Sequence, residues 1–230
     1  MSPRSRRMRL LIAATSFADA QAALRLAERL GTGLASDLLG LMVEETEALA
    51  LAQLPGRQVV TQSGRMMPPP APEALRRMLD REARAFEQGL ARLAEAQMLR
   101  WSFRREGGEL VRGVLAALQG GQGDLLILGQ GTARGPLGAI LALGPEAGAA
   151  AQLARQLGKA LGRPVEVLDA SDPVRLPARL ARRRAAAVVI GPDLLPGTDP
   201  EGLRALLGAA RCPVLLLRDP HPTGLPTTGQ

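Results

Sequence analysis

Short apolar runs alternate along this chain with longer segments in which apolar residues recur every three or four positions. The run at 10–14 (LLIAA) contains no polar residue, which is typical of a strand covered on both faces of a parallel sheet. The next segment, 19–34, places its apolar residues on one face at helical spacing, and a second apolar run follows at 38–43. This order of strand, helix and strand predicts two parallel strands joined by a right-handed crossover.

The remainder of the chain continues this alternation, with one interruption. The segment 44–72 contains three successive prolines at 68–70, which fit neither a helix interior nor a central strand, so we expect a loop there. Pro72 is well placed at the start of a long helix, and the alternating run at 99–104 predicts a half-buried edge strand. Further strands are predicted at 125–128, 139–143, 165–168, 186–190 and 214–217, and helices at 73–97, 109–118, 146–161 and 200–209. The basic segment 173–184 is expected to be a helix or a turn.

The chain also contains an internal repeat. Segment 19–41 can be laid without a gap on segment 146–168, 127 positions later, and an apolar run precedes each copy. A period this long indicates two related α/β units rather than a solenoid. We therefore expect an α/β fold with parallel sheets flanked by helices in two pseudo-repeated units. The residues of the first copy that meet identical partners are Ala20, Ala22, Ala23, Leu26, Ala27, Leu30, Gly31, Leu34 and Leu41.

Composition narrows the range of functions. The net charge is +7 and Lys159 is the only lysine, so arginine carries nearly all of the positive charge. Cys212 and His221 are the only cysteine and the only histidine. Their isolation excludes an intrachain disulfide and removes most metal sites, Ser-His triads and Cys-His dyads. We therefore expect a protein that is not an enzyme and has no metal site.

The sequence also bears on the membrane and on targeting. No apolar run approaches the roughly 18 residues that a membrane span needs, so we expect no span and a cytoplasmic location. Four arginines within 4–9 precede the first apolar run, an order that also occurs in secretory signals. Thr15 and Ser16 interrupt that short run, so a first buried strand is the preferred interpretation and a signal peptide the second.

Two stretches carry a resemblance to a known family. Segment 206–218 (LLGAARCPVLLLR) leads from a helix through a Cys-Pro-Val turn into an apolar strand that ends in arginine. Segment 107–131 (GGELVRGVLAALQGGQGDLLILGQG) leads from a helix into an Asp-led apolar strand that ends in glycine. Both resemble universal stress protein domains. The resemblance implies a Rossmann-like, adenine nucleotide alpha hydrolase-like fold in tandem, with a first domain over 9–134 and a shortened second domain over 138–218. The Pro-rich residues 219–230 are expected to be a disordered tail.

The resemblance makes ATP a candidate cofactor, because many universal stress proteins bind it through a Gly-rich loop after the fourth strand. The family spacing is Gly, two residues, Gly, nine residues, and Gly followed by Ser or Thr, and neither unit keeps it. In the second unit, Gly191-Pro192-Asp193-Leu194 lacks the second Gly, and Asp193 would repel a phosphate. We therefore favour no cofactor over ATP. A remaining ATP site would lie in the first unit, at Thr15, Ser16, Val43, Gly129, Gly131, Thr132 and Arg134.

Three hypotheses for the function remain open. The favoured one is a non-catalytic, cytoplasmic, universal-stress-like protein that acts through a protein partner or as a homodimer. Strand 214–217 would pair with a second chain if it lay at a sheet edge. The alternative is a stress regulator that binds ATP or another adenine nucleotide in the first unit. The second alternative is an arginine-mediated binder of nucleic acid or an anionic surface, and the aromatic content of 2% makes nucleic acid the less favoured partner.

Overall fold

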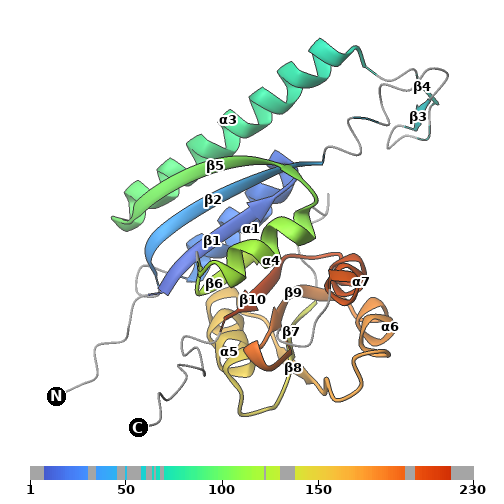
Figure 1. Cartoon of the computed structure of the whole chain (residues 1–230). Helices are drawn as coiled ribbons and strands as arrows, with labels where there is room; N and C mark the ends of the chain where they lie inside the picture. Colours follow the sequence, from blue (N-terminus) through green and yellow to red (C-terminus); the bar gives the residue numbers. More distant parts are fainter. Residues whose placement is uncertain are drawn as a thin grey trace, which may run out of the picture.

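Eight strands form one sheet in the order β5-β2-β1-β6-β10-β9-β7-β8 (Figure 1). The computed structural model describes residues 8–30, 35–45, 50, 58–60, 64, 66–67, 70–121, 123–129, 138–194 and 200–218. The strands of the sheet are β1 (Met8–Ala14), β2 (Ala35–Glu45), β5 (Arg100–Gly108), β6 (Leu125–Leu128), β7 (Ala139–Leu143), β8 (Val165–Leu168), β9 (Ala185–Ile190) and β10 (Val214–Leu217). A separate antiparallel pair, β3 (Val59–Val60) and β4 (Met66–Met67), lies in the segment expected to be a loop.

Neighbouring strands of the sheet are parallel at every junction except one. β10 runs antiparallel to β6, with Val214 opposite Leu128 and Leu217 opposite Leu125. The strands β5, β2, β1 and β6 therefore run one way and the other four run the opposite way. This arrangement corrects the expectation of more than one parallel sheet. It also removes strand 214–217 from the edge, because β10 lies between β6 and β9 with all four of its side chains buried.

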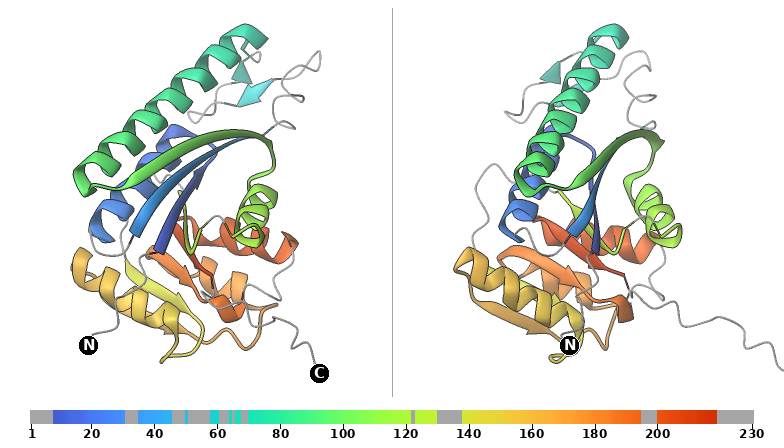
Figure 2. Two further views of the ribbon diagram at one scale, coloured as in Figure 1. Left: turned by 60° about the vertical axis from the view of Figure 1, so that its left-hand side comes forward. Right: turned by 90° about the vertical axis from the view of Figure 1, so that its left-hand side faces the viewer.

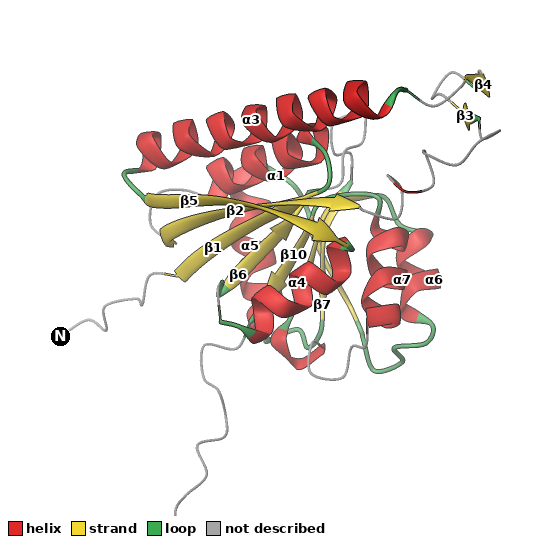
Figure 3. Ribbon diagram, turned by 45° about the horizontal axis from the view of Figure 1, so that its top comes forward, coloured by secondary structure: helices red, strands yellow, loops and turns green. Residues whose placement is uncertain are grey.

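Helices cover both faces of this sheet (Figure 3). Successive side chains of a strand point to opposite faces, so Leu10 and Ile12 of β1 enter one core while Leu11 and Ala13 enter the other. The first core is closed by α1 (Phe17–Leu30), α3 (Pro72–Gln97) and α5 (Ala149–Leu161). The second core is closed by α4 (Leu110–Gln119), α6 (Leu176–Ala181) and α7 (Pro200–Ala210).

A buried aspartate in the middle of the sheet hydrogen-bonds to β1 and to the end of β10. Asp124, which directly precedes β6, is 9% exposed and accepts the backbone N–H of Arg9 at 2.9 Å. The backbone carbonyl of Asp124 accepts the N–H of Arg218 at 3.0 Å. A carboxylate this buried is tolerated only when it is hydrogen-bonded. The Asp that leads this strand therefore ties the first strand of the chain to the end of the last one.

The long helix α3 extends beyond the strands that it covers (Figure 2). No side chain of α3 before Ala83 is fully buried, whereas Phe86 and Leu90 are completely enclosed. The ring of Phe86 meets Phe103 of β5 edge to face, with centroids 5.4 Å apart. Gly40 of β2 leaves room for Leu90 of α3, because a Cβ at position 40 would lie 2.9 Å from a methyl carbon of Leu90.

Candidate functional site

Most of the predicted site residues lie at the end of the sheet where β1 and β6 finish. Thr15 and Ser16 follow β1 and face the first turn of α1. The Ser16 hydroxyl donates to the carboxylate of Asp19 at 2.7 Å and accepts the backbone N–H of Asp19 at 3.2 Å. The Thr15 hydroxyl lies 3.4 Å from the same carboxylate oxygen. The Ser16 hydroxyl therefore caps α1, and the Thr15 hydroxyl bonds to the Asp19 carboxylate.

A second carboxylate reaches the same helix end. The backbone N–H of Phe17, the first residue of α1, donates to Glu82 of α3 at 3.2 Å. A helix N-terminus attracts anions because its first N–H groups lack partners within the helix. Here Asp19 and Glu82 supply that negative charge from within the chain. A phosphate at this position would have to displace or face both of them.

Gly129 lies in close contact with the backbone at this end of the sheet. Its N–H donates to the carbonyl of Ala13 at 3.2 Å, and a Cβ on Gly129 would lie 1.9 Å from the backbone oxygen of Asp19. Val43, in contrast, is buried on the α4 face of the sheet, in the second core. The described part of this end thus brings Thr15, Ser16 and Gly129 together, with the carboxylates of Asp19 and Glu82 beside them. Gly131, Thr132 and Arg134 lie outside the described residues.

The opposite end of the sheet holds a cavity of about 700 Å³. The antiparallel junction between β6 and β10 places the carboxyl ends of β7, β8 and β9 at this end. The carboxyl ends of parallel strands are where open α/β sheets place their ligands. The residues that line the cavity are Gly144, Pro145, Glu146, Arg155, Val165, Val167, Asp169, Ala170, Ser171, Asp193 and Leu194.

The cavity combines apolar side chains with a charged rim. Val165 and Val167 of β8 are half-buried, and Ala170 is buried. Asp169 and Asp193 are both exposed. With Glu146 they make three carboxylates against the single guanidinium of Arg155, so the lining is net acidic.

Local hydrogen bonds fix the rim in place. The hydroxyl of Ser171 donates to Asp169 at 2.6 Å and its backbone N–H donates to the same carboxylate at 3.0 Å. These two bonds hold the pKa of Asp169 below its ordinary value, so the carboxylate stays charged into the acid range. Arg155 donates to the backbone oxygen of Glu146 at 2.8 Å, and Arg179 donates to that of Asp169 at 2.7 Å.

Sequence reasoning passed over this cavity because no glycine spacing marks it. The one signal in the sequence was the pair of glycines that end neighbouring strands, Gly144 after β7 and Gly191 after β9. Gly144 has a φ of +133°, a conformation that favours glycine. The N–H of Gly191 donates to the carbonyl of Leu143 at 3.3 Å, which holds the two strand ends together beneath the rim.

The reactive groups among the described residues are few. Burial raises the pKa of the Cys212 thiol to about 12, so it remains a protonated, unreactive thiol at neutral pH. No cluster of three or more His, Cys, Asp or Glu side chains suited to a metal ion occurs in the described residues. His221 lies outside them.

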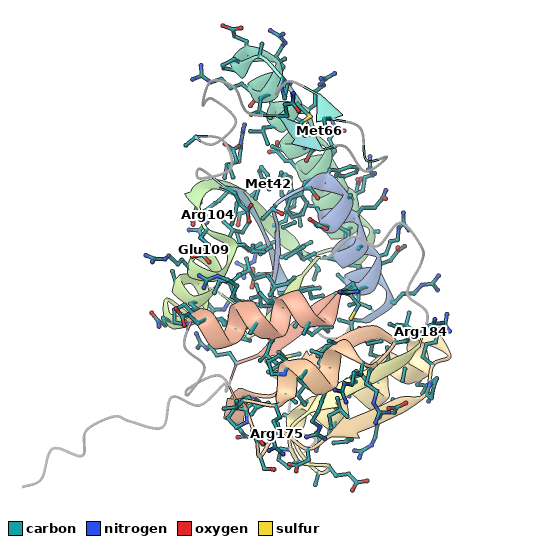
Figure 4. The ribbon with its side chains drawn as sticks, turned by 90° about the vertical axis from the view of Figure 1, so that its right-hand side faces the viewer. Met42, Met66, Arg104, Glu109, Arg175 and Arg184 are labelled. Atoms are coloured by element: carbon teal, nitrogen blue, oxygen red, sulfur yellow. The ribbon has the colours of Figure 1, made fainter. Side chains whose placement is uncertain are left out.

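Two of the five arginines in segment 173–184 pair with nearby acids. Arg175 lies 3.5 Å from Asp172, and Arg183 lies 3.0 Å from Glu166. Figure 4 places Arg175 and Arg184 at separate positions on this half of the molecule. Arg182, Arg183 and Arg184 are all exposed where α6 ends. No helix among the described residues is both long and apolar enough to cross a membrane.

Comparison with known proteins gives a likeness at the level of the fold. No protein-family model matches the chain, and no curated protein matches it. Among solved structures, it is similar to a universal stress protein from Archaeoglobus fulgidus DSM 4304, with 10% identity and a TM-score of 0.43, over 91% of this chain and 98% of that one. It is also similar to the hypothetical protein MJ0577, with 12% identity and a TM-score of 0.36, over 71% of this chain and 96% of that one. The likeness is confined to the arrangement of strands and helices.

Proposed function

We propose that this chain is a non-catalytic regulatory protein whose small-ligand site is the cavity at the carboxyl ends of β7, β8 and β9. The observation that carries the proposal is the contrast between the two ends of the sheet. At one end Asp19 and Glu82 fill the N-terminus of α1, and Gly129 lies against the helix backbone. At the other end about 700 Å³ stays open beside half-buried valines and polar groups. Small-molecule sites commonly occupy volumes of about 300–1,000 Å³.

The proposal includes two universal-stress-like units, over 9–134 and 138–218. Three facts support it. β1 and β2 are adjacent, parallel and joined through α1, just as β7 and β8 are adjacent, parallel and joined through α5. The two connecting helices pack into the same core. The aligned segments 19–41 and 146–168 coincide with these two helices and the strands that follow them.

The charge of the lining selects the class of ligand. Three carboxylates against one arginine disfavour a polyphosphate, since each of these exposed carboxylates repels a phosphate. A neutral or cationic molecule of about nucleoside size fits better, with its apolar part against Val165 and Val167 and its polar groups toward Asp169 and Asp193. We therefore choose adenosine as the probe and ATP as its charged counterpart.

A non-catalytic role agrees with the groups available. The thiol of Cys212 is buried and protonated, and the cavity is lined by neither a histidine nor a cysteine. The bound molecule would then act as an effector that stabilises the loops after β7, β8 and β9, and a protein partner would respond to that change.

Thermal denaturation in the presence of each probe tests the proposal, because a ligand that binds only the folded state raises Tm. Adenosine should raise the Tm of the wild-type chain, and ATP should raise it less. Val167→Trp fills the cavity and should abolish the shift. Its matched control is Val174→Trp, which places the same side chain at a position 87% exposed and outside the lining. An equal shift in both variants, or no shift with the wild-type chain, would contradict the proposed site.

The acidic rim can be tested separately. Asp193→Asn removes one rim charge and should increase the Tm shift that ATP produces. Asp172→Asn removes a carboxylate that does not itself line the cavity, although it follows the lining residue Ser171, and should leave that shift unchanged. A stronger response to ATP than to adenosine in the wild-type chain would contradict the proposed ligand class, and persistence of that response in Val167→Trp would contradict the place as well.

A further inference from the structure

The two edges of the sheet differ in a way that bears on association. The edge strand β8 is short, with four residues. The edge strand β5 has nine residues, Arg100–Gly108, and pairs with β2 in a continuous register without a bulge. Most of its residues are exposed, including Trp101 at 42%. A long, regular edge presents unpaired backbone N–H and C=O groups to any other strand that approaches.

β5 carries charged side chains, but it lacks the proline, lysine and bulges that protect many edge strands. The strand contains no proline and no lysine, and its only glycines are at its end. Each of its arginines already has a carboxylate partner. Arg100 lies 2.9 Å from Asp37, Arg104 lies 3.7 Å from Glu106, and Arg105 bonds to both Glu44 and Asp80. The edge is therefore not an uncompensated row of positive charge that would repel a partner.

The candidate partner for this edge is β5 of a second copy of the chain. In an antiparallel pair, residues directly opposite each other point to the same face, and successive residues alternate between faces. A two-fold axis between two copies of β5 must therefore pass through one residue position, which faces its own copy. Five such positions, 102 to 106, pair five or more residues of the nine-residue strand.

Four of these five registers oppose like charges. An axis at 104, 105 or 106 places Arg104, Arg105 or Glu106 directly against itself, and an axis at 102 places Arg100 against Arg104. Like charges directly opposite on a sheet are destabilising. The axis at Phe103 avoids every such contact. It brings Arg100 opposite Glu106 and Ser102 opposite Arg104.

The same register also covers the exposed aromatic ring. With the axis at Phe103, Trp101 of one chain lies opposite Arg105 of the other. An arginine beside an indole ring is a favourable cation–π pair. We infer that the chain forms a two-fold dimer in which β5 pairs antiparallel with β5 of a second copy, centred on Phe103, so that one sheet continues through both chains.

Charge reversal tests this register directly. The wild-type chain should sediment as a dimer, with twice the 24.2 kDa mass of one chain. Arg100→Glu places two glutamates opposite each other at both ends of the pairing, and Glu106→Arg places two arginines there. Each variant alone should be monomeric. An equimolar mixture of the two should form a heterodimer, because both of its contacts then oppose opposite charges.

Matched controls separate this interface from a general effect of charge. Arg25→Glu and Glu28→Arg make the same charge changes on exposed positions of α1 and should leave the dimer intact. A monomeric wild-type chain, single variants that remain dimeric, or a mixture that fails to associate would overturn the inference. Because the ligand cavity lies beside the opposite edge strand, β8, the Tm shift with adenosine should persist in both β5 variants, so the two proposals fail independently.

Discussion

Gly129 lies so close to Asp19 that a Cβ on the glycine would be 1.9 Å from the backbone oxygen of the aspartate. This contact joins the end of β6 to the first turn of α1. In a nucleotide-binding α/β protein, the space between a strand end and a helix N-terminus is where a phosphate sits. Here the glycine brings the end of β6 directly against the backbone of the first turn of α1.

Substitution of this glycine should therefore destabilise the fold rather than abolish a ligand contact. Gly129→Ala forces the backbone of β6 and α1 apart, and overpacking of this kind costs typically about 1–3 kcal/mol in the free energy of unfolding. Gly208→Ala is the control, since a Cβ at Gly208 of α7 meets nothing within 4 Å. That change should stabilise the chain by about 0.5–1 kcal/mol. Urea denaturation of the two variants gives both values, and equal stabilities would contradict the contact.

The enclosed ring of Phe86 offers a test of how α3 is attached. Phe86 has no exposed surface and packs edge to face on Phe103. Phe86→Ala should lower the free energy of unfolding by about 3–5 kcal/mol, because it leaves a cavity between α3 and the sheet. Phe86→Leu retains most of the volume and should cost clearly less. If Phe86→Ala unfolds at the same urea concentration as the wild type, α3 is not anchored there.

Cys212 predicts a loss of stability at high pH. Burial raises the pKa of its thiol to about 12 from an ordinary 9.0. Above pH 9.0 the unfolded chain releases this proton while the folded chain keeps it. The contribution to stability is thus complete below pH 9.0 and is lost toward pH 12, with a slope of up to about 1.4 kcal/mol per pH unit. Urea denaturation should show this slope in the wild type, and Cys212→Ala should lack it.

The rim of the cavity predicts a titration shift of the opposite sign. The bonds from Ser171 hold the pKa of Asp169 below its ordinary 3.8. Their stabilising effect is therefore present above that ordinary pKa and disappears as the pH falls through the lower, folded value. Ser171→Ala removes the hydroxyl bond and keeps the amide bond, so the pKa of Asp169 should rise part of the way. Carboxyl carbon NMR measures it directly, and Ser36→Ala, far from the cavity, should leave it unchanged.

Much of the fold could be predicted from the periodicity of the sequence. The apolar runs located the strands, and the alternation at 99–104 correctly identified an edge strand, which the structure extends to Gly108. The order of strands in the sheet was harder, because periodicity tells which faces of a strand are buried and not which strand lies beside it. The run Val214–Leu217, apolar at every position, is typical of an interior strand, and it is β10 that joins the two halves.

The candidate site was harder to predict from the sequence than the fold. Thr15, Ser16 and Gly129 do meet, as the strand ends predicted, but the carboxylate of Glu82 comes from a helix 65 residues further along the chain. No local sequence pattern predicts such a long-range contact. The cavity at the other end depends on short loops after three strands, and its lining follows no motif spacing. Only the assembled sheet brings Asp169, Ser171 and Asp193 around one space.

The most direct test of this account is an NMR titration of the isotope-labelled chain with adenosine. The chemical shifts of the backbone amides of Gly144, Ser171 and Asp193 should change together and saturate. The chemical shifts of the Ser16 and Gly129 amides should not change. Saturable shifts at Ser16 and Gly129, or a spectrum that does not respond at any amide, would contradict the assignment of the ligand site to the β7–β8–β9 end.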